Sequence, residues 1–377
     1  MNSAARLLVA AGAIVLAWFV THPPHSDSPT GPSVGPTTAA VRSDPSVQMR
    51  GLCIQLHGGG PERMAEYRKM CDELVQLGAD SVLFVNHAWQ THAGTADLHL
   101  DSQRNPSMPE LQGLCTYATS RRLRVCLMPV VLLSAPRGTE WRGRINPTAG
   151  WDEWFNRYTQ VIVAHARVCE ASRVDVLMVG SELIKTEQYT VRWRNLIAEV
   201  RQVFGGRLGY SANWDHYTTD KISFWPYLDC VGMTSYYTLV SHPNPTIQEV
   251  VAGWQTYKAR IDAFHRQIPR LPILFTEVGW CSQEGAVTEP WNYYHNMTAS
   301  ALGLEEQANC FRAFLQVWGD VPYVGGIFWW EWSLYAGGPN DYNYTPRGKP
   351  AEQILRQWFR SGRVAASQPS EAADEPG

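Results

Sequence analysis

The feature of this sequence that most constrains its fold is a regular alternation of short β-rich apolar runs with longer, helix-like stretches. Eight runs are expected to form strands, at residues 51–56, 81–85, 125–131, 176–180, 208–211, 230–234, 273–275 and 326–330. Stretches with the apolar spacing of helices lie between or after them, at residues 63–77, 108–120, 151–170, 191–204, 245–267, 304–318 and 350–359. Strands that alternate with helices indicate a parallel sheet, because each helical connection returns the chain to the same edge.

Eight strands favour one closed barrel over an open sheet. They lie between residues 48 and 361, a span that suits a (β/α)8 barrel with insertions. The alternative is an open doubly wound sheet, which would carry a glycine-rich phosphate loop after an early strand. The glycine-rich run at residues 57–61, HGGGP, matches neither the dinucleotide pattern nor the Walker pattern. We therefore expect an α/β protein whose residues 48–361 form a single (β/α)8 TIM barrel.

The two ends of the chain differ from this central region. Residues 1–20 carry Arg6 and then an unbroken apolar run, which suits either a signal peptide or an N-terminal membrane anchor. Residues 21–47 are rich in Pro, Ser, Thr and Gly, and residues 362–377 are small, polar and acidic. We expect the first of these segments to be a disordered linker and the second a disordered tail. The protein is expected to be exported: secreted, periplasmic, or membrane-anchored and facing outside the cytoplasm.

Composition limits the classes of function. Lys and Arg number 32 against 35 Asp and Glu, so the net charge of −3 provides no basic excess for binding nucleic acid. Trp is as frequent as Tyr, at 16 residues each, which suits stacking on sugar rings or, alternatively, a large aromatic core. The eight cysteines are scattered through apolar patterns, which favours buried free thiols over disulfides. Neither H-x-H nor H-E-x-x-H occurs, so we expect no metal and no other cofactor, and we expect a monomer.

The residues that follow each strand are the candidates for function, because active sites of such barrels lie at the carboxyl ends of the strands. Glu182 follows the fourth expected strand and Glu277 follows the seventh. Two carboxyl groups across one cleft suit the cleavage of glycosidic bonds, in which one protonates the leaving oxygen and the other is the nucleophile or base. His87 follows the second strand, either as a substrate contact or as a hydrogen-bonding group of the loop.

Six segments in this order resemble glycoside hydrolase family 113, the β-mannanases, within the clan of retaining (β/α)8-barrel glycosidases. They are VGSEL (179–183), YSANWD (210–215), FWPYLDCVGMTSYY (224–237), LFTEVGW (274–280), GIFWWEW (326–332) and YTPRGKPA (344–351). The resemblance implies double displacement on a β-linked polysaccharide or oligosaccharide, with β-1,4-mannan as the first candidate, Glu182 as acid/base and Glu277 as nucleophile. The alternatives are another β-glycan with the same mechanism, or a non-catalytic barrel that binds glycans at the cell surface.

Eight polar or aromatic side chains near the strand ends are expected to bind substrate: His87, Trp89, Asn213, Trp214, Tyr236, Trp280, Trp330 and Trp332. The resemblance gives Tyr236 the role of holding the nucleophile carboxylate and places Asn213 and Trp214 against the sugar. Either Trp330 or Trp332 would form the floor beneath the cleaved bond. The choice depends on strand register, because a slip of one residue turns every side chain to the opposite face.

Overall fold

Eight parallel strands form a closed barrel in the computed structural model, which describes residues 47–334 and 336–361. The strands follow chain order and β8 pairs with β1, so the expected (β/α)8 barrel is confirmed. They are β1 (Met49–Gln55), β2 (Ser81–Gln90), β3 (Arg124–Leu133), β4 (Val176–Ser181), β5 (Arg207–Ala212), β6 (Cys230–Thr234), β7 (Ile273–Val278) and β8 (Val324–Trp329). The expected leader (1–20), the linker up to residue 46 and the tail (362–377) lie outside the described residues.

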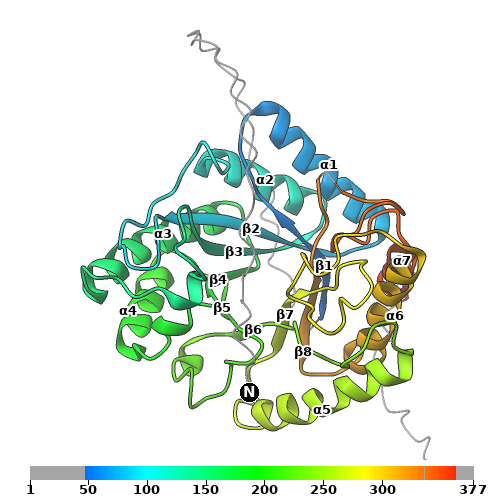
Figure 1. Ribbon diagram of the computed structural model, residues 1–377. Helices are drawn as coiled ribbons and strands as arrows, with labels where there is room; N and C mark the ends of the chain where they lie inside the picture. The colour runs from blue at the N-terminus through cyan, green and yellow to red at the C-terminus, as the bar shows by residue number, and fades with distance from the viewer. Residues whose placement is uncertain (1–46, 335, 362–377) are drawn as a thin grey trace, which may run out of the picture.

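Helices surround the barrel on its outer side, as Figure 1 shows. The α-helices of the described residues are α1 (Pro61–Leu77), α2 (Met108–Ser120), α3 (Trp151–Ala171), α4 (Thr190–Arg201), α5 (Ile247–His265), α6 (Ala301–Trp318) and α7 (Pro350–Arg360). Local sequence sets several of their ends: α2 and α5 begin with capping boxes at Ser107 and Thr246, and α1 ends at Gly78, whose φ is +100°. None of the helices in residues 47–334 and 336–361 combines the length and apolarity that crossing a bilayer requires.

Strands β2 and β3 extend beyond the expected apolar runs and pair along their whole length, from Ser81 opposite Arg124 to Gln90 opposite Leu133. The expectation ended the second strand at residue 85, because polar side chains follow. The strand continues because these side chains find buried partners. Asn86 Nδ2 lies 2.9 Å from His165 Nε2, and Gln90 Nε2 donates to two loop carbonyls at 2.8 and 2.9 Å. Between β5 and β6 the connection contains only a 3₁₀ turn, η3 (Trp225–Tyr227), in place of an α-helix.

Aromatic side chains fill the layer between the barrel and its helices. Seven tryptophans are fully buried: Trp154, Trp193, Trp225, Trp254, Trp280, Trp318 and Trp329. The high Trp content therefore serves the core to a large extent, in agreement with the alternative considered from composition. All eight cysteines are buried and free, which confirms the expectation of unpaired thiols.

The last helix closes the barrel against the beginning of the first strand. The Arg50 guanidinium, on β1, donates from Nη1 to the carbonyl oxygens of Trp358 and Ser361 at 3.1 and 3.2 Å. The Trp358 ring also lies under this guanidinium, 4.9 Å from its carbon to the ring centroid. Because β1 begins at Met49 and α7 ends at Arg360, both ends of the described chain meet at the amino-terminal face of the barrel.

The close pairing of β1 with β2 leads to a prediction about stability. Gly51 lies opposite Ser81, and a Cβ added there would be 2.3 Å from the Ser81 carbonyl oxygen. Gly51→Ala should therefore lower the free energy of unfolding by about 1–3 kcal/mol, because the backbones must separate. Gly113→Ala, in α2 with no heavy atom within 4 Å of its added Cβ, should instead raise it by about 0.5–1 kcal/mol. Urea unfolding of both variants tests this, and equal effects would contradict it.

Candidate active site

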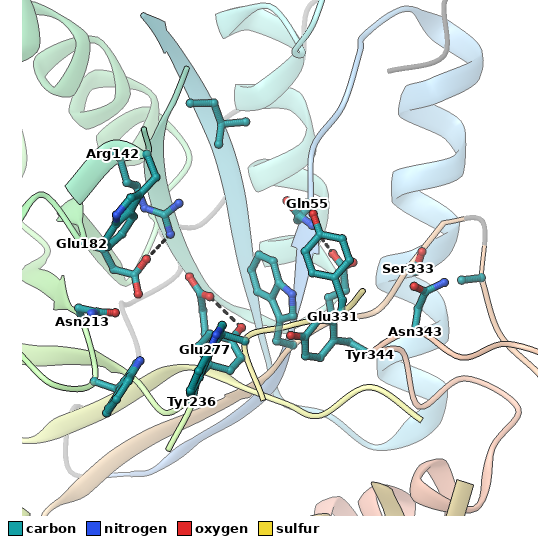
Figure 2. Close-up of a pocket in the computed structure, with 17 residues that line it drawn as sticks. Gln55, Arg142, Glu182, Asn213, Tyr236, Glu277, Glu331, Ser333, Asn343 and Tyr344 are labelled. Carbon is teal, nitrogen blue, oxygen red and sulfur yellow. Dashed lines mark hydrogen bonds and ion pairs between the residues drawn. The ribbon is translucent and has the colours of Figure 1, made fainter. Parts of the chain in front are cut away.

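A pocket of about 340 Å³ opens where the carboxyl ends of the strands meet, and Figure 2 shows its side chains. Its lining comprises Gln55, Leu132, Trp141, Arg142, Glu182, Asn213, Trp214, Tyr236, Glu277, Trp291, Tyr293, Trp330, Glu331, Ser333, Ala336, Asn343 and Tyr344. Aromatic walls with a few converging polar groups are typical of small-molecule and sugar sites. The pocket therefore has the position and the composition of an active site.

Glu182 lies directly after β4, and its backbone conformation directs the side chain into the pocket. Its φ of +51° is in the left-handed region, which is unfavourable for a residue with a Cβ. Two hydrogen bonds hold this turn: the Glu182 N–H donates to the Ser211 carbonyl at 2.8 Å, and the Leu183 N–H donates to the Tyr210 hydroxyl at 2.9 Å. Conformational strain maintained by surrounding bonds is a common feature of functional positions.

Both oxygens of the Glu182 carboxyl group have partners. Arg142, from the 3₁₀ turn η1 (Arg142–Arg144), forms an ion pair with Oε2 through Nη2. Thr234, at the end of β6, donates from Oγ1 to Oε1 at 3.0 Å. Arg142 and Glu182 are only 7% and 5% exposed, so this is a buried ion pair. Sequence reasoning missed Arg142, because it lies in the long loop after β3, where no periodic pattern indicates which side chains turn inward.

Glu277 lies on β7 and shares the pocket with Glu182. The Tyr236 hydroxyl donates to its Oε2 at 2.9 Å, which is the contact implied by the family resemblance. Burial raises the pKa of the Glu277 carboxyl above its ordinary value, and the negative charge of Glu182 raises it further. The positive charge of Arg142 and the hydrogen bond from Tyr236 act in the opposite direction, because both favour the ionised form.

Glu331 contributes a third carboxyl group to the pocket, and sequence reasoning did not place it among the site residues. It follows Trp330 after the end of β8, and the peptide bond between these two residues is cis. Gln55, the last residue of β1, donates from Nε2 to Glu331 Oε2 at 2.7 Å. Burial raises the pKa of Glu331 to about 7, and the bond from Gln55 offsets part of that effect.

Four of the eight predicted binding residues line the pocket together with Glu182 and Glu277: Asn213, Trp214, Tyr236 and Trp330. Asn213 donates from Nδ2 to Asp215 at 2.6 Å, which fixes the orientation of its amide. The Trp214 ring stacks on Trp291 with a centroid distance of 5.8 Å and an interplanar angle of 11°. This pair of parallel indoles was not expected, since Trp291 lies in an irregular segment far along the chain.

Trp280 and Trp332 do not line the pocket, contrary to expectation. The Trp280 indole is fully buried and packs edge-on against Trp254 in the outer layer, at 6.3 Å between centroids. Trp332 turns toward α1, where its Nε1 donates to Glu73 Oε2 at 2.9 Å. Strand alternation would place Trp330 and Trp332 on the same face, because they are two residues apart, but β8 ends at Trp329 and the alternation stops there.

His87 and Trp89 also lie outside the pocket, in the extension of β2. The His87 ring stacks on His57 at 4.9 Å, and Trp89 packs beneath the Arg104 guanidinium at 4.6 Å. Asn105 connects them: its Nδ2 donates to the His87 carbonyl, and its Oδ1 accepts from Trp89 Nε1 at 3.4 Å. Their contacts are therefore those of a packed loop. Burial lowers the pKa of His87 to about 3, which keeps the ring neutral.

Comparison with known proteins identifies the family. The model of Glycoside Hydrolase Family 113 matches residues 60–361. A solved complex of a GH113 β-1,4-mannanase is 26% identical, with a TM-score of 0.72 over 84% of this chain and 100% of that chain. The GH113 β-mannanase AaManA from Alicyclobacillus acidocaldarius, in complex with ManMIm, is 24% identical, with a TM-score of 0.72 over 83% and 97%.

More distant structures share the fold alone. A β-glucuronidase from Ruminococcus gnavus is 11% identical, with a TM-score of 0.53 over 83% of this chain and 50% of that chain. No curated protein matches the chain. The family match, by contrast, spans α1 to the end of α7 and includes both carboxylates that follow the fourth and seventh strands. The chain therefore belongs to glycoside hydrolase family 113 and is a retaining glycoside hydrolase.

Proposed function

We propose that this protein hydrolyses a β-linked mannan, with β-1,4-mannan as its substrate, by double displacement at Glu277 and Glu182. One observation carries the proposal: carboxyl groups from β4 and β7 line the same aromatic pocket, and the Tyr236 hydroxyl fixes the one on β7. The likeness to a solved β-1,4-mannanase over all of that chain supports the choice of polymer.

In the first step, Glu277 attacks the anomeric carbon while Glu182 protonates the departing glycosidic oxygen. The bond to the leaving sugar breaks, and a covalent ester forms between Glu277 and the sugar that remains. In the second step, Glu182 removes a proton from water, the water oxygen attacks the anomeric carbon, and Glu277 leaves as a carboxylate. Two inversions retain the β configuration. This mechanism predicts a separation of about 5–5.5 Å between the two carboxyl groups in a substrate complex.

The free pocket favours the opposite distribution of charge, because Arg142 forms an ion pair with Glu182 Oε2 while burial raises the pKa of Glu277. Two carboxyl groups in one buried site resist carrying two negative charges, so the pair tends to keep one proton. Catalysis requires Glu277 to be ionised and Glu182 to carry the proton, so the proton has to be redistributed between them before the first step. The Tyr236 hydroxyl, which donates to Glu277 Oε2 at 2.9 Å, favours this arrangement because it stabilises the Glu277 carboxylate.

The pH dependence should reveal the Tyr236 bond. Tyr236→Phe removes a donor that favours ionised Glu277, so the pKa of Glu277 should rise further. The acidic limb of the pH profile of kcat/KM should then move to higher pH by about one unit, as expected for the loss of one hydrogen bond to a charged group. Tyr237→Phe is the matched control, since the Tyr237 hydroxyl contacts the Met233 sulfur and does not line the pocket. Coincident acidic limbs in both variants would contradict the assignment.

The function is tested by the release of reducing ends from β-mannan, glucomannan, β-glucan, xylan and galactan. We expect activity on β-mannan, with the β-anomer as the first product in a proton NMR time course. Activity restricted to another polymer would keep the mechanism and replace the substrate. Binding of mannan without hydrolysis would favour the non-catalytic glycan-binding barrel. A first product of α configuration would contradict double displacement.

We further propose that the protein is exported. The apolar run within residues 1–20, followed by a segment rich in Pro, Ser and Thr, supports export. A fusion of residues 1–47 to a reporter that is active only outside the cytoplasm should give signal, and a variant with two arginines inserted into the apolar run should not. Recovery of the reporter in the soluble or the membrane fraction distinguishes a cleaved leader from an anchor.

A further inference from the structure

Glu331 is a half-buried carboxyl group at the pocket for which double displacement has no use. Its only hydrogen bond within residues 47–334 and 336–361 is the one that Gln55 donates to Oε2 at 2.7 Å. The described part of the chain supplies no cation to this carboxyl group, whereas Glu182 has Arg142. Oε1 therefore remains available to a molecule that enters the pocket, because Glu331 belongs to the pocket lining.

The position of Glu331 in the barrel determines which part of a substrate it can reach. Around the barrel, β5 and β6 lie between β4 and β7, and β8 and β1 follow on the other side of β7. Gln55, on β1, and Glu331, after β8, therefore lie on that other side. Figure 2 shows the same arrangement at the level of side chains: the Glu182–Arg142 pair and the Glu331–Gln55 pair lie on opposite sides of Glu277. If Glu182 protonates the leaving oxygen, the departing sugar lies on its side. Glu331 then faces the sugar that stays on the enzyme.

The chemistry of this corner suits sugar hydroxyl groups. A carboxylate only accepts hydrogen bonds, and each of its oxygens can accept two, so it can bind neighbouring hydroxyls of one ring. Trp330, which precedes Glu331 and also lines the pocket, adds an aromatic surface beside it. An acceptor that a bound ligand covers without pairing is costly, so a ligand without the matching donor is rejected.

We propose that Glu331, held in place by Gln55, binds hydroxyl groups of the sugar on the non-reducing side of the cleaved bond and selects glycans that carry them. The side of the bond rests on the proposed function, in which Glu182 is the acid. Recognition of hydroxyls by Glu331 rests only on the pocket geometry. The two can therefore fail separately.

The test crosses a change in the protein with a change in the ligand. Binding of β-1,4-mannotetraose and of its monodeoxy analogues is measured by calorimetry on full-length protein carrying Glu277→Gln, which abolishes turnover. The same ligands are then measured after addition of Glu331→Ala, and separately after addition of Glu62→Gln, at an exposed position in the first turn of α1, as a control. At least one deoxy analogue should bind about 10- to 100-fold more weakly than the parent when Glu331 is present. With Glu331→Ala that ratio should fall below about threefold, while the control keeps it.

Each outcome decides the inference. Loss of selectivity at one ring position in Glu331→Ala alone supports it, even if the intact protein hydrolyses no polymer, in which case the proposed function fails by itself. Equal selectivity in both backgrounds overturns the inference, even if mannan is hydrolysed. Weaker binding of every ligand by the same factor also overturns it, because that pattern indicates a structural role. If no analogue binds more weakly than the parent, or no oligosaccharide binds at all, the recognition site does not exist.

Discussion

Replacing Glu277 with glutamine should abolish the hydrolysis of β-mannan, with a loss in kcat on the order of 10⁴-fold or more. An amide cannot form the ester through which the retaining mechanism proceeds. Glu331, the other carboxyl group on that side of the pocket, engages Gln55 and cannot replace it at the same position. The loss should appear in kcat while the dissociation constant for mannotetraose changes little, because glutamine keeps the size of the side chain and an oxygen that can accept from Tyr236.

The identity of the nucleophile can be verified independently of activity. A 2-deoxy-2-fluoro β-mannosyl fluoride should glycosylate the unmodified protein and release fluoride. The fluorine at C2 slows both formation and hydrolysis of the ester, whereas the good leaving group at C1 speeds its formation alone, so the ester accumulates. Peptide mass spectrometry should then place the added sugar on Glu277, and the Glu277→Gln protein should remain unlabelled. A label on Glu331, or on any other carboxylate, would refute the assignment.

Removing the side chain of Glu182 should affect both catalysis and stability. Glu182→Ala should lower kcat on mannan by about 10²- to 10⁴-fold, because the leaving sugar departs without a proton. Substrates with an acidic phenol as leaving group should lose much less in the first step, since that group needs no protonation. Azide should restore turnover and yield a β-glycosyl azide, because a small anion fits where the carboxylate stood and needs no general base.

The stability effect follows from the buried ion pair. Glu182→Ala leaves the Arg142 guanidinium, only 7% exposed, without its counter-charge, and we expect the free energy of unfolding to fall by about 3–5 kcal/mol. The double variant Glu182→Ala with Arg142→Leu should recover much of this stability and none of the activity on mannan. Thermal and urea unfolding of the three proteins test this. A single variant as stable as the unmodified protein would show that the pair is not a buried charge pair in solution.

Much of the architecture could be predicted because it depends on periodic patterns. Every expected strand exists, since a buried parallel strand is a short apolar run and little else in the sequence resembles one. The active sites of such barrels lie at the carboxyl ends of the strands, and this rule predicted that Glu182, Glu277 and Tyr236 share one site. All three line the same pocket. These residues are within two positions of a strand end, so the barrel itself determines where they point.

The remaining parts of the site lie where periodicity stops. Arg142 and Trp291 reach the pocket from irregular segments, whose path depends on tertiary contacts that no local pattern encodes. Trp332 was expected beside Trp330, yet the strand ends before both and the chain turns one of them toward α1. The position of Trp280 could not be predicted either. A Trp that follows a catalytic strand can pack in the aromatic core as readily as it can stack on a sugar, and Trp280 is fully buried.

The contacts of Arg50 with the end of α7 have a consequence for how the enzyme can be mounted. They hold the start of β1 and the end of α7 at the amino-terminal face of the barrel, whereas the pocket opens on the carboxyl-terminal face. Whatever is joined to either end, whether a membrane anchor, a scaffold or a resin, is attached behind the working surface. A polymer much longer than the protein can then pass across the mouth of the barrel without meeting the support to which the enzyme is attached.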